Sequence, residues 1–136
     1  RLCLRGSPSS LSQHAGLAAH RRGDAWVGEQ GDVQRGRLGK VLETLGGIPG
    51  VEPGNPEAAL YVFPKVEGLL EMRGFPDDST FCARLLAEEG VRAVPGSAFG
   101  QSGYLRLSYG LEDPRLEEAL TRLAGFAERS REVRPG

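Results

Sequence analysis

The stretch AVPGSAFGQSGYLRLSYG, residues 93–110, joins a turn to a short strand that carries an arginine between two leucines. Pro95 and Gly96 are typical of a turn, and the alternation in residues 103–109 is typical of a strand. Because successive side chains of a strand point to opposite faces, Arg106 lies on the face opposite the leucines. We expect the leucine face to pack on helices. The pattern alone leaves open whether Arg106 is an ordinary solvated side chain or faces a ligand or another domain.

One amphipathic helix is predicted before this stretch and another after it. STFCARLLAEEG, residues 79–90, has Asp78 or Ser79 as the expected N-cap and Gly90 as the expected end, and a strand is expected to follow at residues 91–94. After the stretch, Asp113 is the expected cap of a helix with proline at its first position. The buried stripe of that helix is predicted to consist of Leu116, Leu120, Leu123 and Phe126 or Ala127.

The first half of the chain predicts two helices, a loop and a strand. The helices are expected at residues 11–20, capped by Ser9 or Ser10, and at residues 24–45. Residues 46–57 are rich in glycine and proline and predict a loop, and residues 58–66, with Pro64 near their end, predict a strand. This order favours an α+β fold, in which helices cover one face of a small sheet.

Composition describes one globular domain and excludes some partners. The 136 residues carry a net charge of −1, which gives no sign of a nucleic-acid partner, and no apolar run is long enough for a membrane span. Cys3 and Cys82 match no metal-binding spacing and are expected to be reduced thiols. We therefore expect a cytoplasmic protein.

Three segments together resemble the class I and II aminotransferases, pyridoxal-phosphate enzymes of fold type I. They are SPSSLSQHAGLAA, IPGVEPGNPEAALYVFPKV and GVRAVPGSAFGQSGYLRLSYG, in the family's order along the chain. The resemblance implies the α+β small C-terminal domain of that fold at residues 49–130. It also implies a helical segment at residues 1–48, leading from a large cofactor-binding domain, and a frayed tail at residues 131–136.

The resemblance also implies roles for individual residues. Arg106 is expected to bind the α-carboxylate of an amino acid or 2-oxo acid substrate, and Phe99 is expected to line the substrate pocket. Ser9 and Ser10 match a region near the cofactor phosphate, although GSP stands here where the family commonly has SNP. Neither of the two lysines lies in the family's serine-and-lysine context, so no catalytic residue is expected in this chain.

We therefore expect the C-terminal third of an aminotransferase, inactive by itself, from a homodimeric parent that binds pyridoxal phosphate. Related lyases and synthases share the small domain and remain open. Two further alternatives are a ferredoxin-like module that binds an amino acid and catalyses nothing, complete from about Ala58 onward, and the ligand-sensing domain of a transcription regulator.

Overall fold

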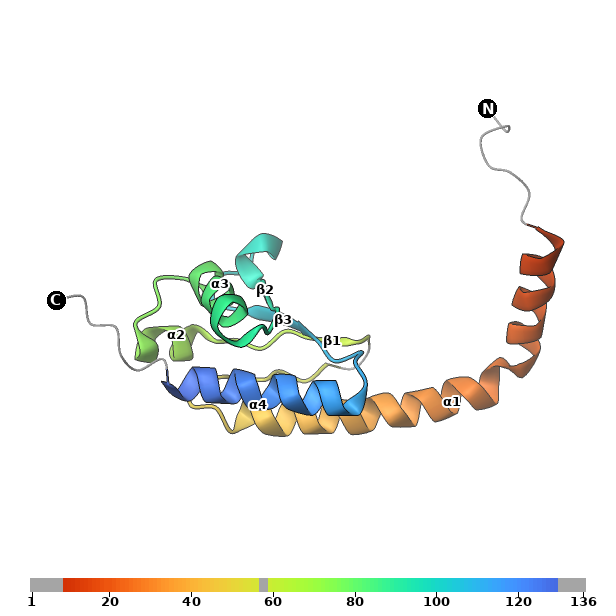
Figure 1. Cartoon of the computed structure of the whole chain (residues 1–136), viewed down its shortest axis with the longest axis horizontal. Coiled ribbons are helices and arrows are strands. Elements are labelled where there is room, and N and C mark those ends of the chain that lie inside the picture. Colours follow the sequence, from red (N-terminus) through yellow and green to blue (C-terminus); the bar gives the residue numbers. More distant parts are fainter. Residues whose placement is uncertain (1–8, 57–58, 130–136) are drawn as a thin grey trace, which may run out of the picture. The chain divides into compact units, whose positions relative to one another are not determined.

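The computed structural model describes residues 9–56 and 59–129, whose elements are shown in Figure 1. Contacts between residues divide the chain into two units, Arg1–Arg35 and Gly36–Gly136. Within the described ranges, no helix combines the length and the apolar character that a bilayer span requires. Ala58, Cys3 and the predicted tail at residues 131–136 lie outside the described residues.

Helix α1 (Ser10–Gly46) is continuous, so the expectation of two separate helices is wrong. Ser9 caps it as predicted, because its Oγ accepts a hydrogen bond from the backbone N–H of Ser12 at 3.1 Å. Glycine lowers helix stability but, unlike proline, leaves every backbone hydrogen bond in place, and α1 contains no proline. Apolar side chains of α1 within the first unit are exposed to solvent. Trp26, for example, is 62% exposed.

The sheet is antiparallel, with the strand order β1-β3-β2. Its strands are shorter than predicted: β1 (Tyr61–Val62), β2 (Val94–Pro95) and β3 (Leu105–Ser108). In the register, Val62 faces Leu107 and Val94 faces Arg106. Since β3 is the central strand, its residues have neighbours on both sides.

The predicted turn at Pro95 and Gly96 differs from the structure. Pro95 ends β2, and residues Gly96–Phe99 form a short 3-10 helix, η1. Proline has no N–H to donate, so it can occupy only the end or the edge of a strand. The loop from η1 to Gly103 then leads into β3.

Three further α-helices follow α1 in the part of the chain that the structure describes. They are α2 (Glu67–Arg73), in a segment without a clear sequence signal, α3 (Asp78–Glu89) and α4 (Asp113–Arg129). Asp77, one residue before the two predicted candidates, caps α3 by accepting from the Thr80 N–H. Gly90 ends α3 in the left-handed conformation as predicted. Asp113 is the first residue of α4, and its carboxylate binds Arg37 in place of capping the helix.

The core lies between the leucine face of the sheet and the helices. The predicted stripe of α4 is buried, and the last turns of α1 add Val41 and Leu45. Phe75, Phe81 and Phe126 form an aromatic cluster with ring centroids 5.1 to 6.1 Å apart. The α+β prediction is thus confirmed to the extent that a small three-stranded antiparallel sheet lies among helices (Figure 1).

Candidate carboxylate-binding site

Strand β3 presents Arg106 on the face of the sheet that the helices leave open. Leu105 and Leu107, its neighbours in sequence, are buried among the helices and anchor the strand. Arg106 itself is half-buried. The alternation read from the sequence is confirmed, and the guanidinium is carried by the most constrained strand of the sheet.

Two aromatic rings flank the guanidinium of Arg106. Its Cζ lies 5.0 Å from the ring centroid of Tyr61 and 4.6 Å from that of Phe99. Each contact of this kind contributes about 0.5–1 kcal/mol at an exposed site and restricts where the guanidinium lies. Among the described residues, Arg106 forms no ion pair or hydrogen bond. Its N–H donors are therefore free to bind a carboxylate from outside this part of the chain.

The rings beside Arg106 belong to a larger aromatic surface, which we call the aromatic face: Tyr61, Phe63, Phe99 and Tyr104. Phe63 stacks on Tyr104 with centroids 5.2 Å apart and meets Phe99 edge-on at 6.2 Å. Phe99 is 52% exposed, and the rings of Tyr61 and Phe63 are also open to solvent. Phe99 thus lies beside Arg106. Its expected place in a substrate pocket stays a prediction.

From the sequence, Tyr61 and Phe63 are expected to pack in the core or at a domain interface. Both are exposed, so the assignment to the core is wrong, and the interface stays a prediction. The alternation in LYVF already places these two rings on one face of a strand. That this face is shared with Arg106 follows from the antiparallel pairing of β1 with β3, which sequence alone does not provide.

The lysines do not provide a cofactor site within the described residues. Lys40 Nζ lies 2.5 Å from Glu117 Oε1, and Lys65 Nζ lies 3.2 Å from Glu67 Oε2. These hydrogen bonds raise the pKa of both lysines, so both stay protonated at neutral pH. A Schiff base needs a neutral amine. Neither described lysine is therefore held as a neutral amine, and the expectation that this chain contributes no catalytic residue stays a prediction.

Ser9 and Ser10 lie at the start of α1. The Oγ of Ser9 accepts from the Ser12 N–H and lies 3.0 Å from the Ser12 Oγ. Ser9 therefore already has a structural function as a helix cap. Ser9 and Ser10 belong to the first unit, whereas Arg106 and Phe99 belong to the second.

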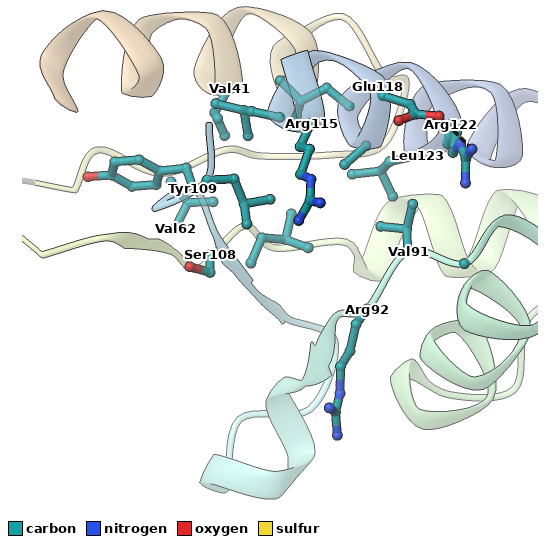
Figure 2. Close-up of a pocket in the computed structure, with 16 residues that line it drawn as sticks. Val41, Val62, Val91, Arg92, Ser108, Tyr109, Arg115, Glu118, Arg122 and Leu123 are labelled. Atoms are coloured by element: carbon teal, nitrogen blue, oxygen red, sulfur yellow. Dashed lines mark hydrogen bonds and ion pairs between the residues drawn. The ribbon is translucent and has the colours of Figure 1, made fainter. Parts of the chain in front are cut away.

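A cavity of about 430 Å³ lies on the other side of the sheet from Arg106, between α4, β3 and the segment before β2 (Figure 2). Aliphatic side chains line it, among them Val62, Leu107, Leu120 and Leu123. Figure 2 shows Arg115 pointing from α4 toward the strands and Arg92 pointing away from them. Arg106 and Phe99 are not in its lining, because β3 turns its leucines toward the cavity. The predicted site residues Arg106 and Phe99 thus lie at the aromatic face and not in this cavity.

Comparison with known proteins identifies one family. The family described as aminotransferase class I and II matches residues 4–123. The aspartate aminotransferase of Bacillus subtilis is 36% identical over 123 residues, which cover 90% of this chain and 31% of that protein. The LL-diaminopimelate aminotransferase of Oleidesulfovibrio alaskensis is 40% identical over 116 residues, covering 84% and 28%.

Solved structures agree with this assignment. The aspartate aminotransferase from Rhizobium meliloti superposes with a TM-score of 0.85 at 34% identity, covering 93% of this chain and 33% of that one. The chain thus spans about a third of the length of the relatives that it matches. The family match begins far upstream of Ala58, which favours a transferase over a module that is complete from that residue. On this evidence, the chain belongs to the class I and II aminotransferases.

Proposed function

We propose that this chain is the C-terminal, small-domain part of a pyridoxal-phosphate-dependent aminotransferase, and that Arg106 binds the α-carboxylate of its substrates. The parent protein would transfer an amino group between an amino acid and a 2-oxo acid. The observation that carries the proposal is a half-buried guanidinium, held between two rings and without an anionic partner among the described residues.

The chemistry of arginine suits this role. A guanidinium is planar, stays charged, and offers two parallel N–H donors that match the two oxygens of a carboxylate. An exposed ion pair contributes at most about 1 kcal/mol, but shielding from water strengthens it. The rings of Tyr61 and Phe99 provide part of that shielding and hold the guanidinium in place. The rest of the parent protein would complete the shielding of the guanidinium from water.

The proposal assigns residues 49–130 to the small domain and residues 1–48 to the segment leading from the large domain. Pyridoxal phosphate would be held by the large domain, with Ser9 and Ser10 near its phosphate. The parent would be a cytoplasmic homodimer. The family membership supports these assignments, together with the engagement of both described lysines in ion pairs.

The direct test is a chimera in which this chain replaces the matching third of the Rhizobium meliloti aspartate aminotransferase. Transamination of aspartate with 2-oxoglutarate is measured for the chimera and for Arg106→Lys. The lysine keeps the charge but loses the paired donors, so kcat/KM should fall about 100-fold, or about 2.7 kcal/mol of transition-state stabilisation. Arg115→Lys, at an exposed arginine on α4 across the sheet from Arg106, is the matched control and should change kcat/KM less than twofold.

Each outcome tests a different part of the proposal. Pyridoxal phosphate absorbance should be the same in all three proteins, which shows that the cofactor site is intact. An Arg106→Lys chimera with kcat/KM within twofold of the parent chimera contradicts the role of Arg106. A chimera that binds the cofactor and transfers no amino group contradicts the proposed function.

Two further measurements do not depend on the chimera. The reading frame upstream of Arg1 should encode a cofactor-binding domain with a serine-and-lysine motif, and an unrelated domain there would contradict the proposal. The purified 136-residue chain, mixed with pyridoxal phosphate, should show no absorbance band of a lysine imine. Such a band would mean that Lys40 or Lys65 reacts after all.

A further inference from the structure

Asp78 stands out because it is the one buried charged side chain among residues 9–56 and 59–129, with an exposure of 2%. It lies in the first turn of α3. Removing a carboxylate from water is costly unless hydrogen bonds replace its hydration. The partners of Asp78 therefore indicate what this side chain does.

Those partners lie in the loop between η1 and β3. Oδ2 of Asp78 accepts from the backbone N–H of Ser97 at 3.0 Å and from that of Gly103 at 3.1 Å. Oδ1 accepts from the Oγ of Ser97 at 2.8 Å and, at 3.5 Å, from the Oγ of Ser79. One carboxylate thus ties together the two ends of the segment 97–103.

The same segment carries Phe99, whose ring centroid lies 4.6 Å from Cζ of Arg106. We propose that Asp78 is a positioning residue for the carboxylate site: it holds the segment 97–103 so that Phe99 stays against Arg106. This inference rests on the function proposed for Arg106. It adds a residue that touches neither substrate nor cofactor and acts through the loop.

The two oxygens of Asp78 face different kinds of group. Oδ2 faces two backbone N–H groups, which can only donate, and Oδ1 faces two serine hydroxyls, which can donate or accept. An asparagine could keep these contacts with its NH₂ group toward the hydroxyls, whereas an alanine removes every acceptor. Helix capping does not explain the residue, because the neighbouring Asp77 already accepts from the Thr80 N–H at 2.6 Å. The two adjacent aspartates therefore have separate tasks: Asp77 starts the helix, and Asp78 holds the loop.

The pair provides a matched experiment. Asp78→Ala and Asp77→Ala are made in the 136-residue chain, and amide hydrogen exchange is measured by NMR. In Asp78→Ala the amides of Ser97 and Gly103 should exchange at least tenfold faster, and the cross-peaks between the Phe99 ring and the Arg106 side chain should weaken. In Asp77→Ala only the Thr80 amide should exchange faster. Equal acceleration in both variants, or none at Gly103, overturns the proposal.

The same two variants are then placed in the Rhizobium meliloti chimera. Asp78→Ala should raise KM for aspartate about tenfold while the cofactor absorbance stays unchanged, and Asp77→Ala should leave KM within twofold. An unchanged KM in Asp78→Ala overturns the positioning role. If Asp78→Ala does not fold, Ser97→Ala removes one donor only and should show the same pattern at smaller amplitude.

Failure of this inference is distinguishable from failure of the proposed function. If Arg106→Lys leaves kcat/KM unchanged but Asp78→Ala frees the loop, the role of Arg106 is wrong and the loop contact stands. If Arg106→Lys abolishes activity but Asp78→Ala changes neither exchange nor KM, the function stands and the positioning role is wrong.

Discussion

Replacing Gly96 with alanine tests how closely the loop after β2 lies against β3. Gly96 is buried at the start of η1, and its N–H donates to the carbonyl of Tyr104 at 2.7 Å. A Cβ at this position would lie 2.3 Å from the carbonyl oxygen of Gln101 and 2.7 Å from the Cβ of Tyr104. Most of the conflict is with backbone, which cannot move aside alone. The methyl group would therefore push the loop away from the strand.

The magnitude follows from these contacts. Inserting a methyl group into a packed site costs about 1–3 kcal/mol. The displaced loop would also lose two backbone hydrogen bonds, from Gly96 to Tyr104 and from Gln101 to Gly96, at about 1 kcal/mol each. We expect the free energy of unfolding to fall by about 3–5 kcal/mol.

Gly100→Ala, in the same loop, is the matched control. Gly100 has a φ of 77°, and a Cβ there would meet nothing within 4 Å. Its cost is therefore only that of the left-handed backbone, about 1–2 kcal/mol. Both variants lose the same glycine entropy in the unfolded state, so that effect cancels in the comparison.

Urea unfolding followed by circular dichroism measures both variants. The midpoint should fall further for Gly96→Ala than for Gly100→Ala, by an amount equal to about 2 kcal/mol at equal m-values. If Gly96→Ala is destabilised no more than Gly100→Ala, the close approach of the loop to β3 is refuted.

Two further predictions concern ionisable side chains. Burial raises the pKa of Cys82 to about 12, so its thiol stays neutral at about pH 8 and should resist a thiol reagent until the protein unfolds. Mass mapping of labelled peptides distinguishes it from Cys3, and rapid labelling of Cys82 in the folded chain would show that it is accessible. The hydrogen bond from Arg37 lowers the pKa of Asp113 below 3.8. Its contribution to stability is therefore present above that pH and lost as pH falls through the lower, folded-state value. Asp113→Asn should flatten the dependence of Tm on pH below about pH 4, and an unchanged dependence would contradict this.

Features carried by neighbouring residues were predictable. The alternation around Arg106 predicted which face of β3 is buried, and the apolar spacing of α4 predicted its buried stripe. Gly90 was correctly placed at the end of α3 because a left-handed C-cap favours glycine locally. Ser9 was correctly named as a cap for the same kind of local reason.

Errors arose where two local signals competed. Asp77, Asp78 and Ser79 are all good N-cap residues, and only the position of the loop shows that Asp78 is used elsewhere. The sequence analysis predicted an interruption at residues 21–23, but these residues include no proline, and the glycine there lowers helix stability without removing a hydrogen bond. The strand lengths were overestimated because side-chain preference does not show how much of a segment finds a partner strand.

The sequence by itself determined the family, the helical stripe of α4, and an arginine on the open face of a strand. It could do so because these features depend on residues within a few positions of one another. Only the tertiary structure decided that Tyr61 and Phe99 flank Arg106 and that Asp78 holds the loop. Those contacts join residues 7 to 45 positions apart. They depend on how strands pair and where a loop packs, which no local pattern encodes.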